Sequence, residues 1–125
     1  MNRETKHKYN LPRTTKTVDA AGQSVGRLAS TVAKILMGKD KADYSPQTDC
    51  GDCVEVKNVD KLRWTGNKLN SRLYRSHSRY PGNLKEIRVS SVWERNPGEV
   101  FRKTVYSMLP NNRLRAKRLL RIKFV

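Results

Sequence analysis

The chain has 125 residues, of which 36% are hydrophobic, and 27 Lys and Arg residues against 11 Asp and Glu residues give it a net charge of +16. This length and composition predict one domain with a single modest core, and no stretch approaches the roughly 20 apolar residues of a membrane-spanning helix. Self-repulsion at this charge density opposes compactness, so we expect a polyanionic partner to stabilise the working state.

The first 16 residues are basic, hold a single acid and have no apolar core segment, which excludes a secretory signal. A mitochondrial presequence and a basic RNA-binding tail share this composition, and we favour the tail. We therefore expect a cytoplasmic location, with an organelle as the alternative.

The first half of the chain predicts a strand, a helix and a second strand. Residues 16–20 are β-prone, and apolar residues then recur at helical spacing between Ser24, a good N-cap, and Gly38, a good C-terminal stop. The alternation at residues 53–57 predicts a strand, and residues 62–65 predict another. This order of elements indicates a βαβ unit with parallel strands.

The second half predicts mostly helix. Residues 72–75 are expected to form a short extended piece inside a basic loop. Asn96 is placed to cap a helix that starts with Pro97 and ends before Pro110. A short basic helix over residues 114–120 follows.

One motif is typical of an enzyme. Residues 22–26 read G-Q-S-V-G, which fits the G-x-S-x-G pattern of serine hydrolases. That mechanism needs a base beside the serine and an acid to orient the base, and the two histidines, His7 and His77, lie in the tail and the basic loop. Ser24 as an ordinary helix cap is the better interpretation. No paired carboxylates or phosphate-binding glycine loop stand out, so we expect no catalysis and no cofactor.

The two cysteines form a lone C-x-x-C motif, Cys50 and Cys53. This spacing is compatible with zinc or with a redox disulfide, but a structural zinc site needs two more ligands, and a redox pair normally precedes a helix rather than a strand. We interpret both as reduced thiols and keep the zinc and redox readings as alternatives.

The basic residues are concentrated in three segments. Residues 1–16, 61–88 and 102–125 carry net charges of +4, +7 and +8, whereas the stretches between them are slightly acidic. In the middle segment the bases alternate with aromatic residues and with Ser and Asn, which offers positive charge, stacking surfaces and hydrogen-bond donors together. This combination suits folded RNA with exposed bases, and no recognition helix or zinc finger favours DNA.

Five stretches, in order along the chain, resemble the large-subunit ribosomal protein 13 family in its bacterial form. They are VDAAGQSVGRLAS, ILMGKDKADYSP, GDCVEVKNVDKLRWTGNKL, YRSHSRYPGNLK and MLPNNRLRAK, beginning at Val18, Ile35, Gly51, Tyr74 and Met108. The resemblance implies a three-layer α/β/α fold around a mostly parallel four-stranded sheet. It also implies a structural role in the large ribosomal subunit, where the protein binds rRNA and supports assembly.

The charge distribution predicts a division of the chain, and the resemblance implies its partners. We expect a basic tail (1–15), a globular domain (16–110) with a basic loop (65–85), and a basic C-terminal segment (111–125). The expected partners are large-subunit rRNA, neighbouring ribosomal proteins and the protein's own mRNA, without a membrane. The family usually has other residues in place of the two cysteines and often continues beyond Val125. A free regulatory module that acts on mRNA is the alternative function.

The predicted rRNA contacts combine bases and aromatic residues from all three basic segments with two lysines that follow the first helix. They are Arg3, Lys6, Lys8, Arg13, Lys39, Lys41, Lys68, Arg72, Tyr74, Arg75, His77, Arg79, Tyr80, Lys85, Arg102, Lys103, Arg113, Arg115, Lys117, Arg118 and Arg121.

Overall fold

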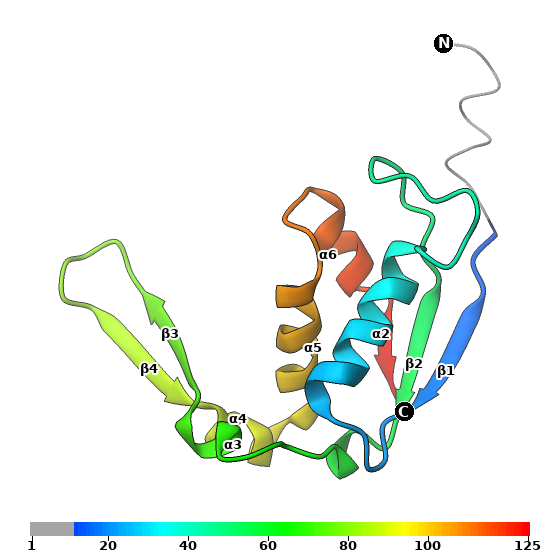
Figure 1. Cartoon of the computed structure of the whole chain (residues 1–125). Helices are drawn as coiled ribbons and strands as arrows, with labels where there is room; N and C mark the ends of the chain where they lie inside the picture. Colours follow the sequence, from blue (N-terminus) through cyan, green and yellow to red (C-terminus); the bar gives the residue numbers. More distant parts are fainter. Residues whose placement is uncertain (1–11) are drawn as a thin grey trace.

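The computed structural model describes residues 12–125, and a parallel sheet lies at one end of the molecule (Figure 1). Its strands are β1 (Thr15–Asp19), β2 (Cys53–Lys57) and β5 (Ile122–Phe124), in the order β1-β2-β5. Both outer strands run parallel to β2. The expected α/β class with a parallel sheet is therefore confirmed.

The helices cover one face of this sheet. Val54 and Val56 of β2 point into the core and are fully buried. On the opposite face Thr17, Glu55 and Lys123 lie side by side in register and are exposed or half-buried. The expected fourth strand and third layer are thus not confirmed in the described part of the chain.

The helix α2 (Val25–Met37) connects β1 to β2, as predicted. Leu28 and Leu36 are on its buried stripe. The helix ends at Gly38, whose φ of +79° lets its N–H reach the carbonyl groups of the last turn, so the predicted stop is confirmed. Ser24 occupies the N-cap position, but its side chain makes no capping hydrogen bond.

The helix α5 (Pro97–Met108) packs along α2 through the buried Phe101 and Val105. Its start confirms the prediction, because the Asn96 side chain accepts a hydrogen bond from the Glu99 N–H at 3.2 Å. The short helix α6 (Leu114–Leu119) then leads the chain into β5. That last strand was not predicted.

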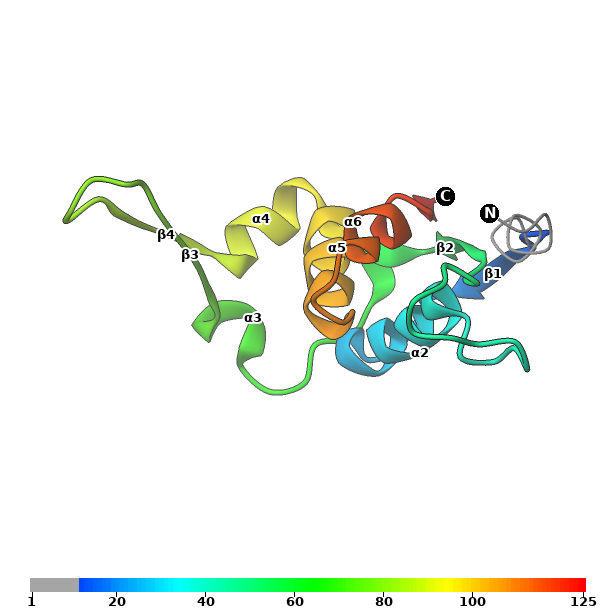
Figure 2. The same ribbon diagram turned by 90° about the horizontal axis from the view of Figure 1, so that it is seen from above.

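A second, antiparallel pair of strands projects from this body (Figures 1 and 2). It consists of β3 (Leu73–His77) and β4 (Leu84–Arg88), which we call the hairpin. The short helices α3 (Lys68–Ser71) and α4 (Val89–Arg95) join it to the body. The predicted extended piece at residues 72–75 is therefore confirmed in β3, whereas its pairing with β4 was not predicted.

The predicted strand at residues 62–65 is wrong. The chain passes through a short 3₁₀ turn, η1 (Val59–Lys61), and then makes a single isolated parallel bridge between Arg63 and Ser24. Leu62 is buried and Trp64 is half-buried, so the apolar alternation that suggested a strand reflects packing of a connecting segment.

Candidate nucleic-acid interface

The hairpin presents basic groups on a regular backbone. In register, Arg75 faces Glu86 and His77 faces Leu84. Arg75 Nε donates to Glu86 Oε1 at 2.8 Å, and Glu86 is the only acid between residues 61 and 88. Since both side chains of this ion pair are exposed, it adds little to stability and leaves the arginine accessible to a stronger anion.

The tip of the hairpin, residues 78–83, is an ordered turn. The Ser78 hydroxyl accepts hydrogen bonds from the Tyr80 N–H at 3.3 Å and from Asn83 Nδ2 at 2.9 Å. Gly82, with a φ of +77°, completes the turn. This arrangement leaves Tyr80 80% exposed, beside the exposed Arg79, so the turn offers an aromatic ring and a guanidinium at its end.

Tyr74 has a different place from the other aromatic residues of the hairpin. It packs against the small apolar cluster of Val89, Val92 and Val100 at the hairpin base. Burial raises the pKa of its phenol, and Lys103 Nζ lies 4.5 Å from the centre of its ring. One face of the ring is thus already occupied, and in this arrangement Tyr74 anchors the hairpin to α5.

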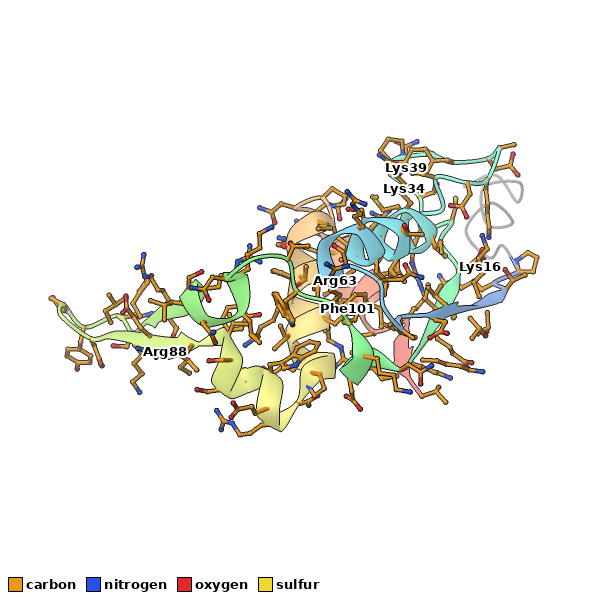
Figure 3. All side chains as sticks on the ribbon, turned by 60° about the horizontal axis from the view of Figure 1, so that its bottom comes forward. Lys16, Lys34, Lys39, Arg63, Arg88 and Phe101 are labelled. Carbon is orange, nitrogen blue, oxygen red and sulfur yellow. The ribbon has the colours of Figure 1, made fainter. Side chains whose placement is uncertain are left out.

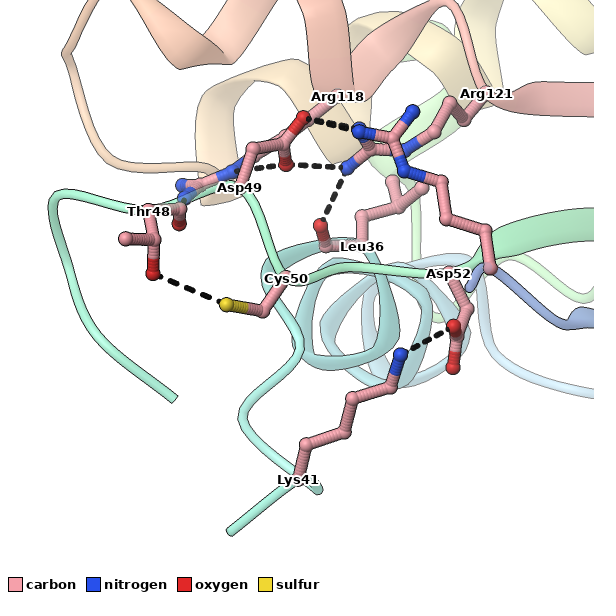
Figure 4. Close-up of polar contacts among 9 residues, drawn as sticks. Leu36, Lys41, Thr48, Asp49, Cys50, Asp52, Arg118 and Arg121 are labelled. Atoms are coloured by element: carbon pink, nitrogen blue, oxygen red, sulfur yellow. Dashed lines mark hydrogen bonds and ion pairs between the residues drawn. The ribbon is translucent and has the colours of Figure 1, made fainter. Parts of the chain in front are cut away.

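Two of the predicted contacts are buried inside the body. Arg118 and Arg121 are 1% and 8% exposed and converge on Asp49 (Figure 4). Arg121 Nη2 donates both to Asp49 Oδ1 at 2.8 Å and to the Leu36 carbonyl at 2.9 Å. Their guanidinium groups therefore hold the C-terminal segment to the loop after α2 and face away from an outside partner.

Arg13 joins the same carboxylate from the exposed side, with Nη2 3.2 Å from Asp49 Oδ2. Burial alone would raise the pKa of Asp49, but the hydrogen bonds and charge of Arg121, together with Arg13 and Arg118, bring that pKa below its ordinary value. We call these four residues the Asp49 cluster.

A second carboxylate orders the loop between α2 and β2. Asp52 is 2% exposed and accepts from Lys41 Nζ at 2.6 Å and from the Thr14 N–H at 3.2 Å. Burial opposes ionisation of Asp52, but its hydrogen bonds from Lys41 and Thr14 lower its pKa. Lys41 is therefore engaged within the chain, while Lys39 is exposed at the end of α2, away from the hairpin (Figure 3).

Some of the predicted contacts of the C-terminal half are engaged within the chain, and others are free within residues 12–125. Arg102 stacks over the Phe124 ring at 5.3 Å, and Lys103 also pairs with Glu99 at 3.0 Å. Arg115 lies 3.6 Å from the centre of the Tyr106 ring and donates to the Tyr106 carbonyl. Among the predicted contacts from residue 102 onward, the exposed bases that make no such contact within residues 12–125 are Arg113 and Lys117.

The thiols do not lie in a metal site of the described chain. Cys50 is buried, with Sγ 3.0 Å from the Thr48 hydroxyl, and Cys53 lies half-buried on β2. Residues 12–125 contain no group of three or more His, Cys, Asp or Glu side chains that could hold a metal ion.

Two basic residues near α2 were missed by the sequence analysis. Arg27 and Arg63 are exposed and line the same groove as Lys68, and an adjoining cavity is lined by Arg63, Lys68 and Arg72. Both missed residues lie in segments that the apolar pattern assigned to the scaffold.

Arg3, Lys6 and Lys8, the predicted rRNA contacts of the N-terminal tail, lie outside the described residues. Within the described part of the chain, no helix has the length and apolar character needed to cross a membrane.

Comparison with known proteins shows the family of this chain. The family model for ribosomal protein L13 matches residues 13–124. The large ribosomal subunit protein uL13 of Aquifex aeolicus is 52% identical over 106 residues, which span 85% of this chain and 74% of the relative. Its counterpart in Brevibacillus brevis is 50% identical over 97 residues, 78% of this chain and 67% of the relative. The one in Pelobacter propionicus is 45% identical over 114 residues, 91% of this chain and 80% of the relative. The expected resemblance is confirmed, and the chain belongs to the ribosomal protein L13 family.

Proposed function

We propose that this protein is a non-catalytic structural constituent of the large ribosomal subunit, where it binds large-subunit rRNA and supports subunit assembly. The observation that carries the proposal is the hairpin of a member of this family. It extends beyond the apolar core with Arg75, Arg79 and Lys85 exposed and with one acid among them. A surface of this kind has no use within the fold itself and matches a polyanion.

The proposed contact set is narrower than the one predicted from sequence. It comprises the exposed bases of the hairpin with Tyr80 and His77, the exposed bases near α6, and Lys39. Arg118 and Arg121 are left out because they are buried against Asp49, and Tyr74 is left out because it is packed at the hairpin base. The basic tail stays a predicted contact, and the own mRNA stays a predicted partner.

Binding would rest mainly on phosphate neutralisation. Each neutralised phosphate contributes about 0.7–0.9 to the slope of log affinity against log salt concentration. Arginine suits this surface because its planar fork pairs with two phosphate oxygens or stacks on a base. A base stacked on Tyr80 adds about 1–3 kcal/mol.

The test compares the binding of deproteinised bacterial large-subunit rRNA by the wild type and by the Arg75→Ala, Arg79→Ala, Lys85→Ala triple variant. Three lost contacts make the salt slope shallower by about 2–3. A matched triple variant, Lys57→Ala, Lys61→Ala, Lys123→Ala, removes the same charge from exposed positions outside the hairpin. Equal slopes for the wild type and the hairpin variant, or equal losses in both variants, would refute the role of the hairpin.

We also keep the four-stranded, three-layer arrangement as a proposal. Its support is the exposed sheet face at Thr17, Glu55 and Lys123, because parallel sheets are usually covered on both faces.

A further inference from the structure

A groove runs between the start of α2, the segment 63–68 and the end of α5. We call it the α2 groove. It has a volume of about 800 Å³, and its wall includes Gly26, Arg27, Arg63, Lys68 and Met108. Three of these side chains are cationic, and none of them forms an ion pair with an acid of residues 12–125. The groove is therefore open, positively charged and large enough for a nucleotide.

The backbone fixes Arg63 at this place. Its N–H donates to the Gln23 carbonyl at 2.8 Å, and its carbonyl accepts from the Val25 N–H at 3.3 Å. These bonds hold the segment after η1 against the first turn of α2, and Figure 3 shows the Arg63 side chain beside that turn. The arginine is thus attached to a rigid part of the scaffold rather than to a free loop.

The first turn of α2 leaves donors available. The first hydrogen bond within the helix runs from the Leu28 N–H to the Ser24 carbonyl. The N–H groups of Gly26 and Arg27 precede it, and no atom of residues 12–125 accepts from them. Because Ser24 does not cap the helix and no acid lies in the first turn, these donors and the positive end of the helix face the groove uncompensated.

Gly26 leaves the helix backbone open at the wall of the groove. It is the second residue of α2, and a Cβ added there would meet no atom within 4 Å outside the backbone of its own helix. Gly38 and Gly51 differ, since a Cβ there would clash with neighbouring backbone. No contact within the described chain requires a glycine at position 26, and the missing side chain leaves the helix backbone accessible to an outside partner.

We propose that the α2 groove binds the sugar-phosphate backbone of rRNA. In this arrangement the strand lies against Gly26, one phosphate accepts from the N–H groups of Gly26 and Arg27, and Arg27, Arg63 and Lys68 neutralise it and its neighbours. This inference rests on the proposed function and adds a second contact surface, on the rigid body of the protein. A short span through α3 separates it from the hairpin.

The test uses side chains that fill the groove without damage to the helix. Gly26→Ala and Gly26→Gln introduce good helix formers, so we expect Tm to stay the same or to rise. Binding to deproteinised bacterial large-subunit rRNA should weaken modestly for Gly26→Ala and at least about tenfold for Gly26→Gln, because the longer side chain occupies the space of the strand. Thr31→Gln, an exposed change on the same helix outside the groove, is the matched control and should bind like the wild type.

A charge variant completes the test. Arg27→Gln with Arg63→Gln should make the salt slope shallower by about 1.4–1.8, the share of two phosphate contacts. If the wild type shows no salt-dependent rRNA binding, the proposed function fails. If the wild type binds and the hairpin variant is weakened, but Gly26→Gln and the double arginine variant bind like the wild type, only the α2 groove is refuted.

Discussion

Among the acidic residues that the sequence alone would place on the surface, Asp49 should be the one whose replacement by alanine lowers the stability of the fold most. The carboxylate accepts from Arg121 at 2.5 and 2.8 Å, lies 3.6 Å from Arg118 Nε and 3.2 Å from Arg13 Nη2. Two of these arginines are almost fully buried. Its removal leaves two guanidinium groups in the interior without a counter-charge.

The magnitude follows from that burial. Removal of one partner from a buried ion pair destabilises a protein by about 3–5 kcal/mol, because the other charge stays desolvated. The exposed Arg13 adds little, since surface ion pairs contribute about 0–1 kcal/mol. Against a total stability of about 5–15 kcal/mol, and with about 3–5 °C per kcal/mol at this chain length, Tm should fall by about 10–20 °C.

Urea unfolding followed by circular dichroism measures this effect. Asp43→Ala is the matched control, because Asp43 lies exposed in the same loop and should shift stability by less than about 0.5 kcal/mol. If the free energies of unfolding of Asp49→Ala and Asp43→Ala differ by less than about 1 kcal/mol, the Asp49 cluster does not stabilise the fold as its burial indicates.

The lowered pKa of Asp49 predicts that its contribution to stability depends on pH. Its pKa is lowered from 3.8 in the folded protein, so its contribution is present above that value and is lost as pH falls through the folded pKa. The difference in Tm between the wild type and Asp49→Asn should therefore be full at about pH 6 and shrink below about pH 3.8. A difference that does not change over this range would contradict the assigned ionisation.

Two further substitutions test the fold and the surface separately. Asn96→Ala should lower the free energy of unfolding by about 1 kcal/mol in urea titrations, because the N-cap hydrogen bond from the Glu99 N–H is lost. Asn96→Asp keeps the acceptor and should unfold like the wild type. If Asn96→Ala is as stable as both, the cap does not stabilise α5. Tyr80→Ala should leave Tm unchanged and weaken binding to large-subunit rRNA by about 1–3 kcal/mol, whereas Tyr80→Phe should bind like the wild type; equal affinity of all three would exclude stacking.

Local signals in the sequence predicted local structure well. The helical spacing from Ser24 to Gly38 and the cap at Asn96 each depend on residues a few positions apart, and both helices form where expected. The hairpin was less visible, because its side chains are almost all exposed and give no apolar alternation. Residues 122–124 become a strand only by pairing with β2, a partner far away in the chain.

The buried arginines show why the site was predicted only in part. An arginine in a basic segment is usually exposed, and nothing within the C-terminal segment distinguishes Arg118 and Arg121 from Arg113 or Lys117. Their burial depends on Asp49, about 70 residues earlier in the chain. Pairing over such a separation is a property of the folded chain and leaves no local pattern.

Most of the acids that form ion pairs lie in one loop of the fold. Of the eight ion pairs within residues 12–125, six involve Asp40, Asp49 or Asp52, which lie together in the loop after α2. These carboxylates compensate bases that hold the loop after α2 to β1 and to the C-terminal segment, so they reduce self-repulsion within the body. Much of the uncompensated charge lies on the hairpin, in the α2 groove and near α6, where a polyanion can reach it. A net charge of +16 is thus compatible with a folded body, because the ion pairs hold the body together and the unpaired bases lie on exposed surfaces that a polyanion can neutralise.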